Sequence, residues 1–198
     1  MGCDRIKFLV VAAYPKELAP LCRLGSKHFI IKKNTAFLAA GIGPVAAAFG
    51  LTHFLEDFRP ERIVGIGTAG IINKKFKKGD VVVGKFVAAE SGSPKKKATL
   101  CPTGSLSPRC PTLSHVSIYA PQEISKTEEL RTQLAKAGFD VENLEAYAFA
   151  FVAKKFKIPF VSILGLTNHV GSKGHVEWVR NEELLCKKIA QEIKKLLV

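Results

Sequence analysis

The chain has 198 residues, of which 47% are hydrophobic and 24% are charged. These fractions are close to globular averages and exclude a disordered chain, a collagen and a disulfide scaffold. Thirty Lys and Arg residues against seventeen Asp and Glu give a formal net charge of +13. Because the lysines form small clusters along the whole chain, we interpret the charge as a solvated basic surface, with nucleic-acid binding as the less favoured alternative.

The length suits one domain spanning residues 1–198. No apolar run approaches the roughly 20 residues of a membrane-spanning helix, and the N-terminal residues lack the layout of a signal peptide. No membrane partner is therefore expected. The cysteines are odd in number and form no CxxC pair, which favours reduced thiols in a cytoplasm. They are Cys3, Cys22, Cys101, Cys110 and Cys186.

Strands and helices are predicted to alternate along the chain. Short apolar runs predict strands at residues 6–12, 28–32, 36–40, 63–67, 80–87, 113–120 and 159–166. Helical spacing of apolar residues predicts helices at 44–58, 125–137, 144–156 and 182–198. Pro44 suits a first helical position, and Ser125 with Glu128 matches a capping box. The pattern predicts an α/β fold: a three-layer sandwich on a mixed, mostly parallel sheet.

Residues 91–112 interrupt this alternation with many Ser, Gly, Pro and Lys residues. They predict a long loop, which in a compact domain is either functional or poorly ordered. Cys101 and Cys110 lie within this segment, but their spacing fits no common zinc pattern. No metal site is therefore predicted.

Ligands of open α/β sheets bind at the carboxyl ends of the strands. Four polar segments follow predicted strands or lead into a helix there: 13–17, 67–70, 142–145 and 167–171. Glu145 stands at the mouth of an apolar helix, where it is either a helix N-terminal acid favoured by the dipole or a carboxylate that binds ligand hydroxyls. The glycines around Thr68 either allow a flat ligand to approach the backbone or simply end a strand.

Several blocks, taken in order, resemble the purine nucleoside phosphorylase and nucleosidase superfamily. They are residues 40–50, 58–70, 78–83 and 141–146, the last similar to the family's ribose-binding block. Within the superfamily, residues 9–17 and 167–171 with Trp178 are most similar to futalosine hydrolase. Methylthioadenosine/S-adenosylhomocysteine nucleosidases carry Asp where Asn168 stands. The loop at 91–112 matches neither group.

The resemblance implies a nucleoside phosphorylase-like fold and an enzyme that hydrolyses the N-glycosidic bond of a purine nucleoside without a cofactor. The implied substrate is futalosine or 6-amino-6-deoxyfutalosine, in menaquinone biosynthesis. A methylthioadenosine/S-adenosylhomocysteine nucleosidase is one alternative, and an inactive nucleoside-binding protein is another. The implied partners are the nucleoside and a second copy of the chain in a homodimer, to which the apolar stretch around Phe151 and the helix at 44–58 would contribute.

The resemblance also implies roles for individual residues. Glu17 would deprotonate the attacking water, Glu145 would hold the ribose hydroxyls, and Asn168 would stabilise the leaving purine at N7. Asn143, where many relatives have a second acid, would have a lesser ribose role. The nucleoside would also contact Thr68, Ala69, Gly70 and Leu144. A carboxylate at position 17 repels phosphate, so water is favoured as the nucleophile over phosphate.

Overall fold

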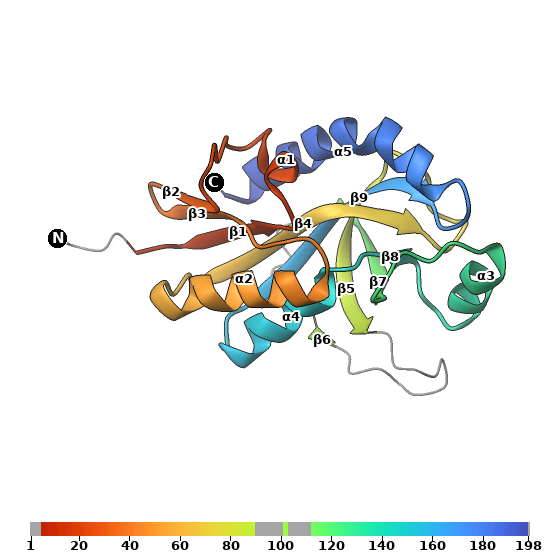
Figure 1. Cartoon of the computed structure of the whole chain (residues 1–198), viewed down its shortest axis with the longest axis horizontal. Helices are drawn as coiled ribbons and strands as arrows, with labels where there is room; N and C mark the ends of the chain where they lie inside the picture. The colour runs from red at the N-terminus through yellow and green to blue at the C-terminus, as the bar shows by residue number, and fades with distance from the viewer. Residues whose placement is uncertain (1–4, 90–100, 103–111, 198) are drawn as a thin grey trace.

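The structure is a computed structural model, and it describes residues 5–89, 101–102 and 112–197. A mixed sheet lies between helices on its two faces (Figure 1). The strands are β1 (Phe8–Ala12), β2 (Phe29–Lys32), β3 (Thr35–Ala39), β4 (Arg62–Ile71), β5 (Val81–Ala89), β6 (Cys101–Pro102), β7 (Ser114–Ala120), β8 (Val141–Glu142) and β9 (Phe160–His169). The helices are α1 (Pro15–Leu18), α2 (Pro44–Asp57), α3 (Glu128–Lys136), α4 (Ala146–Lys155) and α5 (Gly174–Leu196).

Half of the sheet is open and the other half closes on itself. In the open half, β2 pairs antiparallel with β3, while β3, β1 and β4 pair in parallel. In the other half, β4, β9, β5, β7 and β8 pair in that sequence, and β8 returns to β4. The predicted α/β fold on a mixed sheet is confirmed, but the strand ring is a feature that the hydrophobic pattern does not reveal.

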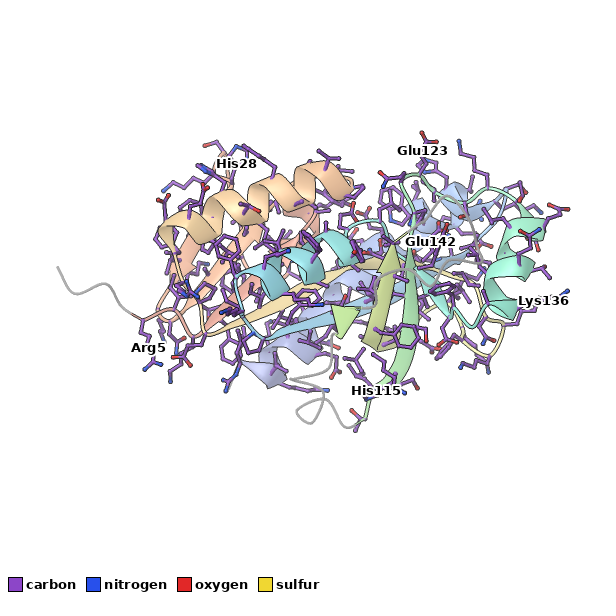
Figure 2. The ribbon with its side chains drawn as sticks, turned by 90° about the horizontal axis from the view of Figure 1, so that it is seen from below. Arg5, His28, His115, Glu123, Lys136 and Glu142 are labelled. Atoms are coloured by element: carbon purple, nitrogen blue, oxygen red, sulfur yellow. The ribbon has the colours of Figure 1, made fainter. Side chains whose placement is uncertain are left out.

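Each face of the open half is covered by a different pair of helices. Figure 1 shows α1 and α5 on one side of the sheet and α2 and α4 on the other, and Figure 2 views the molecule from the side of α2 and α4. The side chains of β1 alternate between these layers: Leu9 and Val11 join the buried cluster of α2 and α4, whereas Val10 and Ala12 join that of α1 and α5. This explains why the strand is apolar at every position, since both of its faces are buried.

The last helix is longer than its sequence pattern predicts. Its apolar face is buried at Leu185, Ile189, Ile193 and Leu196 as expected, but α5 begins at Gly174, eight residues before the predicted start at residue 182. The first two turns contact the strand ends and a cavity rather than the apolar core. They therefore lack the regular apolar spacing on which the prediction depended.

The predicted capping box of α3 is wrong. Thr127, not Ser125, occupies the N-cap, and its hydroxyl accepts a hydrogen bond from the backbone N–H of Leu130 at 3.2 Å. The backbone N–H of Ser125 donates instead to Oε1 of Glu142 at 3.0 Å. Thr127 is itself a good N-cap residue.

The predicted loop at 91–112 lies outside the described residues except for residues 101, 102 and 112. Cys101 and Pro102 form β6, which pairs antiparallel with the end of β5. Cys22 and Cys186 are buried free thiols, while Cys3 and Cys110 lie outside the described residues. Among the helices that the structure describes, none combines the length and apolar character needed to cross a membrane.

Candidate active site

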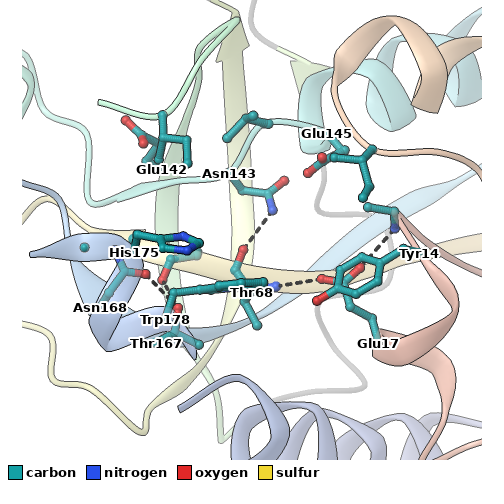
Figure 3. A pocket seen from close by; sticks show the side chains of 17 residues that line it. Tyr14, Glu17, Thr68, Glu142, Asn143, Glu145, Thr167, Asn168, His175 and Trp178 are labelled. Atoms are coloured by element: carbon teal, nitrogen blue, oxygen red, sulfur yellow. Dashed lines mark hydrogen bonds between the residues drawn. The ribbon is translucent and has the colours of Figure 1, made fainter. Parts of the chain in front are cut away.

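A cavity of about 330 Å³ opens at the carboxyl ends of β1, β4 and β9. These strands are parallel neighbours, so residues that are distant in sequence meet at one edge of the sheet. All eight predicted site residues line the cavity, and Figure 3 shows most of them around it. They are Glu17, Thr68, Ala69, Gly70, Asn143, Leu144, Glu145 and Asn168.

Glu17 is held in the cavity by two backbone N–H groups. It lies in the single turn of α1, with Pro15 at the first helical position. Ala13 donates to Oε2 at 3.0 Å, and Thr68 donates to Oε1 at 3.3 Å. Gly67 makes room for the carboxylate, because a Cβ at that position would come within 3.2 Å of Oε1.

The carboxyl of Glu17 keeps its proton to a higher pH than an ordinary glutamate does. Its side chain is almost completely enclosed, with the residue only 6% exposed. Burial raises the pKa of Glu17 to about 8, the negative charge of Glu145 adds to the rise, and the two backbone hydrogen bonds oppose it. At neutral pH Glu17 is therefore largely protonated, and the basic form accumulates as the pH increases.

Glu145 supplies a second buried carboxylate to the same cavity. It is the N-cap of α4, yet its side chain does not cap its own helix. Oε1 accepts instead from the backbone N–H of Gly43 at 2.9 Å, across the loop that precedes α2. Burial raises the pKa of Glu145 above its ordinary value. The carboxylate is thus directed to the cavity and the neighbouring loop rather than to the helix terminus.

Thr68 connects several groups of the site. Its N–H donates to Glu17, its carbonyl accepts from Nδ2 of Asn143 at 2.9 Å, and its hydroxyl accepts from Nε1 of Trp178 at 3.0 Å. Oδ1 of Asn143 accepts from the N–H of Ala146 at 2.8 Å. Both ends of the Asn143 amide are therefore engaged within the protein, which leaves its second N–H and one lone pair of Oδ1 for a ligand.

The amide of Asn168 is fixed by its sequence neighbours. The Thr167 hydroxyl donates to Oδ1 at 2.7 Å, and Nδ2 donates to the His169 carbonyl at 3.1 Å. Oδ1 is therefore directed to a donor and Nδ2 to an acceptor, so the amide has one orientation. The remaining hydrogen on Nδ2 is the group that Asn168 can offer to a ligand in the cavity.

The N-terminal half of α5 holds the strand ends that carry these groups. Besides the contact of Trp178 with Thr68, Nδ2 of Asn181 donates to the Thr167 carbonyl at 2.7 Å. Oε2 of Glu177 accepts from the N–H of His169 at 3.0 Å, and its other oxygen pairs with Lys78 at 2.9 Å. The hydrogen bond from Lys78 lowers the pKa of Glu177 below its ordinary range.

The pattern-based analysis missed part of the cavity wall. His175 and Trp178 stack with ring centroids 5.6 Å apart, and together with Ile42 and Ile124 they give the cavity an apolar surface suited to a planar ring. Trp178 was noticed only through the family resemblance. A helix predicted to begin at Gly174 rather than at residue 182 would place His175 beside Trp178. Within the described residues, no group of three or more His, Cys, Asp or Glu is placed to hold a metal ion.

Comparison with known proteins gives consistent results. The chain is 24% identical over 180 residues to a 5'-methylthioadenosine/S-adenosylhomocysteine nucleosidase of Psychromonas ingrahamii, covering 78% of this chain and 74% of the relative. The native structure of futalosine hydrolase of Helicobacter pylori aligns with a TM-score of 0.86 at 16% identity, covering 100% of this chain and 99% of that one.

A mutant of the Helicobacter pylori methylthioadenosine/S-adenosylhomocysteine nucleosidase, with 5'-methylthioadenosine in its active site, has a similar fold. It aligns with a TM-score of 0.85 at 19% identity, covering 100% of this chain and 99% of that one. The model of the phosphorylase superfamily matches residues 7–102 and 108–198, which is nearly the whole chain. The chain is therefore a member of the phosphorylase superfamily.

Proposed function

We propose that this protein is a purine nucleosidase that hydrolyses the N-glycosidic bond of a small nucleoside. The observation that carries the proposal is the meeting of Glu17, Glu145 and Asn168 in one cavity. Each offers what one part of a nucleoside requires during hydrolysis: a base for water, an acceptor for the ribose diol and a donor for the purine. The names of the relatives support this class of reaction.

The reaction replaces the bond from C1′ to the purine nitrogen with a bond from C1′ to the water oxygen. As the old bond lengthens, the ribosyl group gains positive charge and the purine gains negative charge. The Glu17 carboxylate accepts a proton from the attacking water, and the N–H of Asn168 supports the purine at N7. The proton that Glu17 receives balances the one that the departing base finally takes up.

Water is a better nucleophile than phosphate in this cavity. Two buried carboxylates face it, and the described residues that line it include no Lys or Arg. A phosphate dianion would meet no compensating cation there, and it would be repelled by the basic form of Glu17 that the reaction requires. The assignment is tested by incubating the protein with purine nucleosides, with and without phosphate, and measuring free base. Phosphate-dependent release would contradict it, and tight binding without any release would favour an inactive nucleoside-binding protein.

The activity is expected to depend on pH through Glu17. Because kcat/KM reports the free enzyme and the basic form of Glu17 is the active one, kcat/KM should rise about tenfold per pH unit below the pKa and level off above it. The pKa of about 8 places this change in the weakly alkaline range. In Glu145→Gln the rise should move to lower pH, because the charge of Glu145 contributes to the raised pKa. A profile unchanged in this variant would contradict the coupling.

We propose futalosine, which releases hypoxanthine, as the preferred substrate. Adenine leaves best when N7 is protonated, which suits an acid, whereas hypoxanthine can share its charge with O6, which suits the neutral amide of Asn168. The relatives named as methylthioadenosine/S-adenosylhomocysteine nucleosidases support an adenine nucleoside equally well. Base identity therefore needs its own measurement.

Wild type should show a higher kcat/KM on futalosine than on 6-amino-6-deoxyfutalosine or methylthioadenosine. Asn168→Asp should shift the ratio by about tenfold toward the adenine nucleosides, since an acid can deliver a proton that an amide cannot. A wild-type preference of tenfold or more for an adenine nucleoside would rule out this interpretation of Asn168, and the nucleosidase assignment would then depend on the two glutamates.

We also propose a homodimer, formed through an exposed apolar face on α2 and α4. Val45 and Phe49 are 79% and 73% exposed, and Ile42 and Phe151 extend the face on either side. Such a face is unusual on a monomer. Sedimentation should give twice the 21.6 kDa chain mass at micromolar concentration, and Phe49→Glu should give a monomer. A wild-type monomer under these conditions would refute the proposal.

A further inference from the structure

Glu182 is a buried carboxylate that the proposed reaction does not use. It lies on α5 and is only 2% exposed. Its Oε2 accepts a hydrogen bond from Nζ of Lys16 at 2.8 Å, and its Oε1 has no hydrogen-bond partner. Burial raises the pKa of Glu182. The Lys16 side chain is 63% exposed, and an ion pair with an exposed partner contributes little to the stability of a fold.

The location of this ion pair is more informative than its energy. Lys16 directly precedes Glu17 in α1, which is a single turn without a side-chain cap at its N-terminus. The Lys16–Glu182 ion pair therefore ties the segment that carries the proposed base to α5. Figure 1 shows α1 lying against α5 on the same face of the sheet.

Cys186, one turn after Glu182, marks the same buried layer. Burial raises the pKa of its thiol to about 12, and the charges of Glu17 and then Glu182 add to the rise. Both carboxylates are thus close to one thiol between α1 and α5.

The same helix also holds the opposite side of the cavity. Trp178 contacts Thr68, and Asn181 contacts Thr167, whose hydroxyl orients Asn168. We propose that Glu182 is a positioning residue which, through Lys16, fixes α1 and hence Glu17 relative to α5 and the rest of the site. This inference rests on the proposed nucleosidase function, since it assigns Glu182 a part in placing the base.

Loss of the ion pair should reduce turnover more than binding. Glu182→Gln is expected to lower kcat about tenfold, because small displacements of a reacting group reduce rate steeply, while KM changes less than about twofold. The matched control is Glu183→Gln, which removes the neighbouring exposed carboxylate and its ion pair with Lys187. The control should keep the wild-type kcat. Equal effects in the two variants would overturn the proposal.

A second variant separates positioning from stability. Lys16→Met combined with Glu182→Leu replaces the ion pair with an apolar pair, so Tm should equal or exceed that of wild type. If the ion pair positions Glu17, kcat should remain about tenfold below wild type despite the restored Tm. If kcat returns together with Tm, the pair is merely structural and the proposal is wrong.

Hydrogen–deuterium exchange gives a test that does not need catalysis. The N–H of Ala13 is bonded to Oε2 of Glu17, so its protection reports the position of that carboxylate. Exchange across residues 13–18 should be faster in Glu182→Gln than in wild type and Glu183→Gln. Unchanged exchange would overturn the positioning role. If wild type releases no free base, the proposed function is wrong. The exchange measurement would still test whether the Lys16–Glu182 ion pair positions α1.

Discussion

Glu17→Gln is expected to lower turnover by about 10²- to 10⁴-fold, the range typical for loss of a general base. Nucleoside binding should survive, because the ribose and the base contact other groups. Glutamine has nearly the same shape as glutamate but cannot accept a proton from water. Turnover is measured by release of free base, and binding by titration with a non-hydrolysable nucleoside analogue. Wild-type turnover in the variant would remove Glu17 from the mechanism.

The pH dependence of the stability of the same variant tests the raised pKa of Glu17 independently of catalysis. The folded state holds the Glu17 proton up to about pH 8, whereas the unfolded state releases it near the ordinary glutamate pKa of about 4.5. Between these values the folded state binds more protons, so the free energy of unfolding of wild type falls as pH rises. This contribution is absent from Glu17→Gln, whose Tm relative to wild type should increase from pH 6 to pH 8.5.

Glu145→Ala is expected to weaken nucleoside binding and lower turnover together, with a loss of about 100-fold in kcat/KM. This magnitude corresponds to hydrogen bonds between hydroxyls and a charged group. The two effects should occur together because contacts to the ribose also stabilise the charge that develops on the sugar. Steady-state kinetics on the preferred nucleoside measures both constants.

The 2′,3′-dideoxy form of the substrate is the control for Glu145→Ala. It lacks the hydroxyls that Glu145 would bind, so the substitution should change its hydrolysis little. Glu145→Gln separates the loss of the carboxylate charge from the loss of the contact with the loop, since its amide oxygen can still accept from the N–H of Gly43. If Glu145→Ala loses as much activity on the dideoxy substrate as on the natural one, Glu145 acts on the fold of the loop rather than on the diol.

The sequence was sufficient to locate the strands that build the cavity but not where two of them end, since β4 continues to Ile71 and β9 to His169, beyond the predicted ends at residues 67 and 166. The run from Phe8 to Ala12 is apolar throughout, so its end is easily recognised, and the polar residue Glu17 follows within one turn. The same reasoning applied to Thr68 and Asn168, which lie near the ends of other apolar strands. Local patterns are informative here because a strand with both faces buried is apolar at most positions.

Contacts between distant segments could not be predicted in the same way. His175 lies in the first turns of α5, which pack on strand ends, so no apolar period marks it. Glu182 begins the predicted helix, but a charged residue gives no sign in the sequence that it is buried. The helix at 44–58 shows the opposite problem: Val45 and Phe49 follow helical spacing, yet the structure leaves them exposed and buries Leu51 and Phe54 instead. Periodicity identifies an apolar face but does not say whether the chain itself covers it.

The pairing of β4 with β9 contains an irregularity at the site. Gly165 pairs with Thr68 and Leu166 with Ala69, but Gly70 pairs with Asn168, so Thr167 is an extra residue in β9. Successive residues of a regular strand point to opposite faces, whereas Thr167 and Asn168 both line the cavity. The length of this strand is therefore under a strict constraint: deletion of one residue would restore the regular alternation and remove either the amide or the hydroxyl that orients it. Engineering of this protein should treat β9 as intolerant of insertions and deletions even where single substitutions are accepted.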